Sequence, residues 1–87
     1  MTEEETISWI FLAVALATQT SPTDFVGISM IADGINHAVP TQKEMQVSIS
    51  WLTKQGLISK LGNKYSLSET GKKEFEIASK TSDKVLV

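Results

Sequence analysis

Residues 49–68 read ISWLTKQGLISKLGNKYSLS, and this stretch decides the fold. Apolar residues recur at helical spacing as far as Leu52, and Gly56 stands where a glycine commonly ends a helix. Beyond Gly56, apolar and polar residues alternate, which is typical of a strand. Gly62-Asn63 separates two such runs and is the signal of a two-residue hairpin turn. The stretch therefore predicts the end of a helix followed by a tight β-hairpin.

The turn also predicts the register of the hairpin. Counting outward from Gly62-Asn63 pairs Ile58 with Leu67 and Lys60 with Tyr65. Partners that face each other across two strands lie on the same side of the sheet. We expect Ile58 and Leu67 to reach the core, and Lys60 and Tyr65 to lie nearer the tip of the hairpin.

Two capping boxes predict the starts of the first and third helices. Thr2-x-x-Glu5 precedes a long apolar run and predicts a helix over residues 3–18. Thr41-x-x-Glu44 opens the third helix, which continues to about Gln55. In each box the threonine hydroxyl and the glutamate carboxylate bond to backbone N–H groups that the first helical turn leaves free.

The second and fourth helices have their own signals. Ser21 followed by Pro22 predicts a cap with proline at the first helical position, and the helix ends at Gly34 or Asn36. Ser68 predicts the cap of a last helix over about residues 69–80. Gly71 is expected to allow close packing at its start, and its inner side is predicted to carry Phe75 and Ala78.

Length and composition limit the chain to one small domain. It has 87 residues, of which 41% are hydrophobic and 21% charged, which is ordinary globular usage. We predict a single domain over residues 1–80 and a tail over residues 81–87. Cysteine is absent, which excludes disulfides and thiolate zinc sites. The apolar run at residues 7–17 is too short to cross a bilayer and follows three glutamates, so we expect a buried helix in a cytoplasmic protein.

Charge is divided unevenly along the chain. Residues 1–42 hold five acidic residues and no basic ones, a net charge of −5. Residues 43–87 hold all eight lysines against five acidic residues, a net charge of +3. Only this second half is suited to an anionic partner.

The order of three helices, a hairpin and a closing helix resembles the winged helix-turn-helix superfamily. Residues 49–58 resemble the end of a recognition helix and the entry to a wing. Residues 65–72, Tyr65-Ser66-Leu67-Ser68-Glu69-Thr70-Gly71-Lys72, resemble the exit found in small transcriptional regulators of the MarR and PadR kind. The fold class is thus mainly α with a small β-hairpin. The resemblance implies that the third helix lies in the major groove of DNA and that the hairpin reaches the neighbouring backbone.

A candidate surface for double-stranded DNA lies on the outer face of the third helix and on the hairpin. Its amide and hydroxyl groups are suited to base edges and its lysines to phosphates. The predicted residues are Gln42, Lys43, Gln46, Val47, Ser50, Lys54, Lys60 and Lys64. The sequence thus predicts a DNA-binding transcriptional regulator. Because the chain has no arginine, a lone monomer is not expected to bind tightly. The alternative function is a winged-helix module for protein interaction or dimerisation that binds no DNA.

A homodimer through the first helix is predicted from its second apolar stripe. One small core seldom uses both stripes of a helix, so we expect Trp9, Leu12, Ala13 and Leu16 to contact a second copy. Trp51 has two interpretations: an interface anchor at the edge of the third helix, or peripheral core packed over the hairpin. The second interpretation is favoured.

No catalytic, cofactor or metal site is predicted. His37 is the sole histidine, and no set of ligands surrounds it in the sequence. We expect it to occupy a turn or a helix cap. The five glycines are scattered, so there is no glycine-rich phosphate loop, and no motif joins serine, histidine and aspartate.

Overall fold

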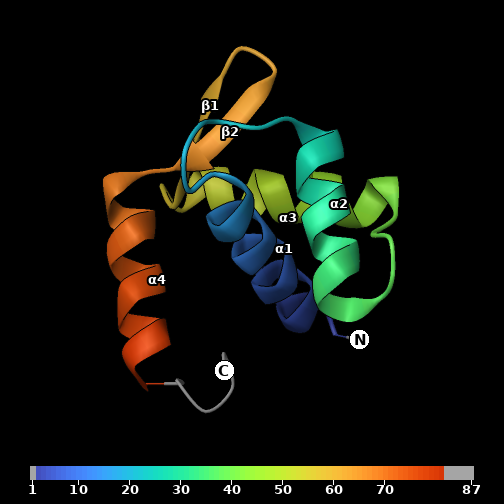
Figure 1. Ribbon diagram of the computed structural model, residues 1–87, viewed down its shortest axis with the longest axis horizontal. Helices are drawn as coiled ribbons and strands as arrows, with labels where there is room; N and C mark the ends of the chain where they lie inside the picture. Colours follow the sequence, from blue (N-terminus) through green and yellow to red (C-terminus); the bar gives the residue numbers. More distant parts are fainter. Residues whose placement is uncertain (1, 82–87) are drawn as a thin grey trace.

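The computed structural model describes residues 2–81, and the side chains among them up to Ala78. This part of the chain forms four helices and a two-stranded antiparallel hairpin, which confirms the mainly α class (Figure 1). The elements are α1 (Glu3–Ala17), α2 (Phe25–Asn36), α3 (Gln42–Lys54), β1 (Ile58–Leu61), β2 (Lys64–Leu67) and α4 (Glu69–Thr81). Apart from Thr81, which ends α4, the predicted tail lies outside the described residues.

Both predicted capping boxes are present. The Thr2 amide N–H donates to Glu5 Oε1 at 2.9 Å, and the Glu5 N–H donates to Thr2 Oγ1 at 3.1 Å. Thr41 and Glu44 make the same pair of bonds at 2.8 and 3.0 Å. The hydrogen bond from the Thr2 backbone, followed by that from its side chain, holds the pKa of Glu5 below its ordinary value. These local bonds start α1 and α3 where the sequence predicts.

The predicted start of α2 is wrong. Asp24 caps this helix by accepting a hydrogen bond from the Gly27 N–H at 3.0 Å, and Pro22 lies outside it. The cause is a tertiary contact: Thr23 exchanges two backbone hydrogen bonds with Tyr65, of 3.0 and 2.7 Å. This bridge keeps Thr23 extended, so the helix begins three residues later, at Phe25. At the other end, His37 caps α2 with a left-handed φ of 55°, as expected for a turn or capping histidine.

The hairpin has the predicted register, with Ile58 opposite Leu67 and Lys60 opposite Tyr65. Lys60 and Tyr65 lie nearer the tip than Ile58 and Leu67, as predicted, but Tyr65 is also buried, with only 8% of the residue exposed. Its ring stacks on Phe25 with centroids 5.3 Å apart, and its backbone pairs with Thr23 on the side away from β1. The hairpin is therefore fastened to the start of α2.

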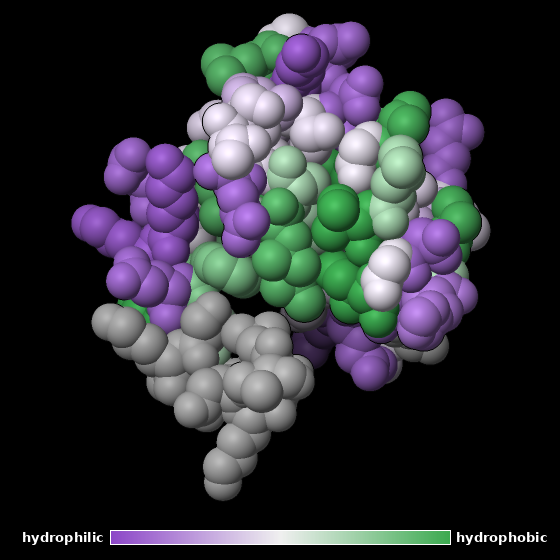
Figure 2. Space-filling model, in the orientation of Figure 1, coloured by the Kyte–Doolittle hydropathy of each residue, from purple (hydrophilic) through white to green (hydrophobic). Residues whose placement is uncertain are grey.

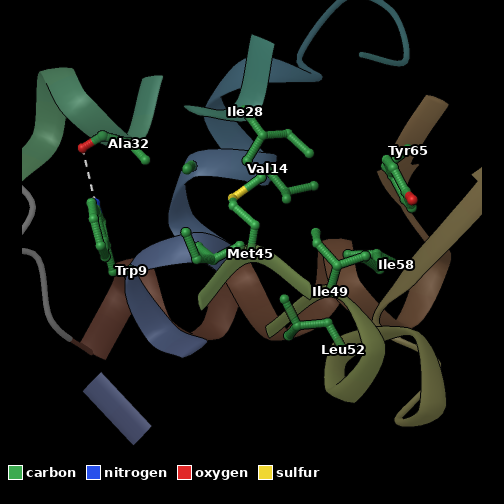
Figure 3. Close-up of a cluster of buried hydrophobic side chains, with 11 residues drawn as sticks. Trp9, Val14, Ile28, Ala32, Met45, Ile49, Leu52, Ile58 and Tyr65 are labelled. Atoms are coloured by element: carbon green, nitrogen blue, oxygen red, sulfur yellow. Dashed lines mark hydrogen bonds between the residues drawn. The ribbon is translucent and has the colours of Figure 1, made fainter. Parts of the chain in front are cut away.

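The core surrounds α1, which packs against α2, α3, β2 and α4. Figure 3 shows Trp9 reaching towards Ala32 of α2, and the Trp9 Nε1–H donates to the Ala32 carbonyl at 2.9 Å. Ile28 contributes from α2, and α3 contributes Met45, Ile49 and Leu52. Because α1 has neighbours on most of its circumference, residues of both apolar stripes enter one core, while Leu12 and Leu16 stay at the surface.

The start of α4 is held tightly against the end of the hairpin. Ser68 caps the helix, since its Oγ accepts from the Gly71 N–H at 3.0 Å and donates to the Gly56 carbonyl. A Cβ on Gly71 would lie 1.9 Å from the Leu57 carbonyl oxygen, which confirms that this position needs glycine. Phe75 packs edge-on against Phe11 at 6.4 Å. The prediction that Ala78 faces inward is wrong, because this residue is exposed.

Candidate nucleic-acid interface

The outer face of α3 carries the predicted recognition residues. Met45, Ser48, Ile49 and Leu52 are buried on the inner side of the helix. All of the predicted α3 residues are exposed: Gln42, Lys43, Gln46, Val47, Ser50 and Lys54. The fold therefore presents one continuous helical face on α3, the helix that lies behind α1 in Figure 1.

This face has a polar edge and an apolar edge. At about 100° per residue, Gln46 and Ser50 fall on one side of the line that joins Lys43 to Lys54. Val47 and Trp51 fall on the other side, with exposed fractions of 38% and 43%. The polar edge and the lysines offer the donors and acceptors that base edges and phosphates use. The apolar edge offers only the indole N–H of Trp51.

None of the four predicted phosphate contacts forms a salt bridge with a carboxylate in the described part of the chain. The ion pair that the structure shows, between Lys72 and Glu69 on α4, involves none of them. Lys43, Lys54, Lys60 and Lys64 are all exposed. Each is therefore available to an anion without first breaking a salt bridge.

The hairpin places its two lysines on opposite sides. Lys60 shares a face with Tyr65, whereas Lys64 shares a face with Leu61, because side chains alternate along a strand. Lys60 also lines a hollow beside Asp24 at the start of α2. One flat surface cannot meet both lysines through the same side of the hairpin. The structure thus brings Lys43 and Lys54 onto one face but divides Lys60 from Lys64.

The acidic N-terminus of α1 lies beside the apolar edge of α3. Glu3 lines a hollow with Lys43 and Val47, and Glu3 and Glu4 line a second one with Trp51. The acidic first half and the basic second half of the sequence are therefore not fully separated in the fold, because negative side chains of α1 border the face of α3 that carries the lysines. They lie on the side of Val47 and Trp51, away from Gln46 and Ser50.

The predicted dimer surface on α1 requires correction. Trp9 is 7% exposed and Ala13 fully buried, both within the core of the single chain. Neither side chain is accessible to a second copy. Leu12 is half-buried and Leu16 is 38% exposed, so these two remain at the surface. In the view of Figure 2, apolar side chains gather at the centre of the molecule, over α1 and α2, and hydrophilic side chains lie over α4.

Trp51 is exposed, so the favoured interpretation of it as peripheral core is wrong. Its position on the apolar edge follows from the helical spacing between Val47 and Trp51, four residues apart on one stripe. The α1 side chains beside Trp51 come close to it through tertiary packing, which no local pattern in the sequence predicts. Sequence reasoning therefore found the residue but missed its surroundings.

Within residues 2–81, no three histidine, cysteine, aspartate or glutamate side chains gather in a way that would hold a metal ion. None of the helices described there has the length and apolar character needed to cross a bilayer. No protein-family model, no curated protein and no solved structure matches this chain.

Proposed function

We propose that this chain is a winged-helix protein that binds double-stranded DNA and regulates transcription. In this proposal α3 enters the major groove with its polar edge, formed by Gln46 and Ser50, towards the bases. Lys43 and Lys54 contact phosphates on either side of the groove. One hairpin lysine adds a third phosphate contact.

The observation that carries the proposal is the accessible outer face of α3 with its two unpaired lysines. Lys43 and Lys54 are eleven residues apart, which at about 1.5 Å per residue separates them by roughly 16 Å along the helix axis. This distance is comparable with the major-groove width of about 12 Å. Lysines near the two ends of α3 are therefore spaced to reach both strands.

The salt dependence of binding to a duplex of random sequence tests the proposal. Each phosphate that a lysine neutralises contributes about −0.9 to the slope of log K against log salt concentration. Three contacts predict a slope of about −2.7. The Lys43→Ala/Lys54→Ala variant should lower the magnitude of this slope by about 1.8 and weaken binding at low salt. Fluorescence anisotropy of a labelled duplex measures both quantities.

Lys72→Ala/Lys73→Ala on α4 is the matched control, because it removes the same charge from another exposed helix. It should leave the slope nearly unchanged. If both variants lose the same affinity and the same share of the salt slope, DNA is held by general charge attraction and not by a defined binding face. Absence of binding by the unaltered protein at low salt would reject the proposal and favour the alternative, an interaction module.

We also propose a weak homodimer through the exposed side of α1, with Leu12 and Leu16 as its apolar contacts. In Figure 1 α1 lies in front of α3, so this contact leaves the α3 face uncovered. A two-fold dimer of this kind directs its two α3 faces away from each other. The expected salt slope is therefore that of one protomer.

Sedimentation equilibrium tests the dimer. We expect a monomer–dimer equilibrium with a dissociation constant in the range of tens to hundreds of micromolar, because the remaining apolar surface is small. Leu16→Glu should shift the protein to monomer by placing a charge in the contact. A monomer at every concentration up to the high micromolar range would contradict the dimer.

A further inference from the structure

Two stripes of side chains border a groove between α1 and α3. The α1 stripe is Glu3, Ile7 and Phe11, and the α3 stripe is Lys43, Val47 and Trp51. Each stripe has a spacing of four residues, which keeps its members on one side of a helix. Two adjoining hollows that share Glu3 make up the groove, with volumes of about 170 and 380 Å³.

The larger hollow is mainly apolar and stands open. Ile7, Phe11 and Leu57 are half-buried around it, and Leu52 forms part of its lining. Trp51 stands at its edge, 43% exposed. A tryptophan left half in water beside a hollow of this size is the kind of residue that anchors protein–protein contacts. The volume lies within the range of sites that take apolar side chains or small ligands.

As far as the structure describes the chain, the groove has an unpaired acidic rim and one buried polar atom without a hydrogen-bond partner. Glu3 and Glu4 are exposed and make no ion pair with any described residue. Ser48 is fully buried and lines the smaller hollow, and its Oγ has no hydrogen-bond partner in the described part of the chain. A ligand does not reach this hydroxyl, because Ser48 has no exposed surface. The groove therefore offers a partner an apolar surface and an acidic rim.

We propose that this groove docks a peptide segment of another protein in which apolar side chains are flanked by lysine or arginine. The apolar side chains pack between Phe11 and Trp51. The basic side chains lie against Glu3 and Glu4, where their charge is complementary to the rim. An amphipathic helix laid along a groove is a common way for such a segment to bind.

The docking site meets the proposed DNA face only at Lys43. The groove uses the Val47 and Trp51 edge of α3, whereas DNA is proposed to use Gln46 and Ser50. Peptide binding therefore does not depend on DNA binding, and either is measurable without the other. Lys43 stands at the boundary between the two surfaces and is left unaltered in the experiment below.

The test uses the full chain and two synthetic peptides of about 14 residues, roughly four helical turns. One peptide carries leucine on one face and lysine on the other, and the second has glutamate in place of lysine. We expect the leucine–lysine peptide to bind with a micromolar dissociation constant and the glutamate peptide to bind at least tenfold more weakly. The emission of Trp51 should shift to shorter wavelength on binding, and Trp51→Phe should abolish this shift while the buried Trp9 stays unchanged.

Three variants test whether the peptide binds in this groove. Glu3→Gln/Glu4→Gln should weaken binding of the leucine–lysine peptide about five- to tenfold, and Trp51→Ala should weaken it at least tenfold. The control Asp33→Asn/Glu74→Gln removes the same charge from exposed positions outside the groove and should change the affinity less than twofold. Equal weakening by the control and the groove variants, equal binding of the two peptides, or no binding at all would overturn the proposal.

Discussion

Trp9→Ala is expected to lower the free energy of unfolding by about 3–5 kcal/mol, the usual cost of removing a buried tryptophan. Trp9 is 7% exposed, and its ring lies between the helices of the core. Its Nε1–H donates to the Ala32 carbonyl at 2.9 Å, so the substitution also removes a bond between α1 and α2. A domain of this length has a total stability of about 4–13 kcal/mol. The stability lost in Trp9→Ala is therefore a large share of the total free energy of unfolding.

Urea denaturation followed by circular dichroism measures this change, with Leu16→Ala as the control on the same helix. Leu16 is 38% exposed, so its truncation should cost less than about 1 kcal/mol. Trp9→Phe keeps an aromatic ring and loses the hydrogen bond, which should cost about 1–2 kcal/mol and leave the protein folded. If Trp9→Ala and Leu16→Ala cost the same, Trp9 is on the surface and the core described here is incorrect.

Gly71→Ala is expected to lower the free energy of unfolding by about 2–3 kcal/mol. The new Cβ would lie 1.9 Å from the Leu57 carbonyl oxygen and 2.9 Å from its carbon, both backbone atoms. To relieve this clash, α4 has to move away from the hairpin. This movement strains the hydrogen bond from the Ser68 N–H to the same carbonyl, which is 3.1 Å long. Overpacking of this kind costs about 1–3 kcal/mol or more.

Gly34→Ala is the matched control, because it adds the same methyl group inside α2. Apart from the adjoining residues and backbone of α2 itself, no atom lies within 4 Å of the position that its Cβ would take. Since alanine favours a helix over glycine, we expect this variant to gain about 0.5–1 kcal/mol. Thermal or urea unfolding of the two variants should therefore shift in opposite directions. An unchanged unfolding midpoint for Gly71→Ala would contradict the close approach of α4 to Leu57.

Local signals predicted most of the secondary structure. Thr2 and Thr41 act within four residues of their partners, and Gly62-Asn63 sets the register through its own turn geometry. Helix starts and strand pairing at these places depend on neighbours in the chain, so the sequence contains the information needed. The start of α2 depends instead on Tyr65, more than forty residues away. Pro22 favours a helix start at its own position, but the backbone pairing of Thr23 with Tyr65 outweighs this preference.

The surfaces were harder to predict than the elements. The exposed polar residues of α3 followed from helical spacing, because α3 has one buried side. For α1 the same reasoning was wrong about Trp9 and Ala13, since four elements pack against this helix and bury part of its second stripe. Trp9 and Trp51 show the difference: each lies on an apolar stripe, yet Trp9 is buried against α2 and Trp51 is half-exposed. Only the packing of the other helices distinguishes them.

Mapping of backbone amide shifts by NMR, with and without a DNA duplex at low salt, tests the proposed DNA face most directly. Binding as proposed should shift the amides of Lys43, Gln46, Ser50 and Lys54, together with those of the hairpin between Lys60 and Lys64. The amides of Leu12 and Leu16 on the exposed side of α1 should stay unchanged. Shifts confined to α1, or no shifts at any DNA concentration, would contradict the account.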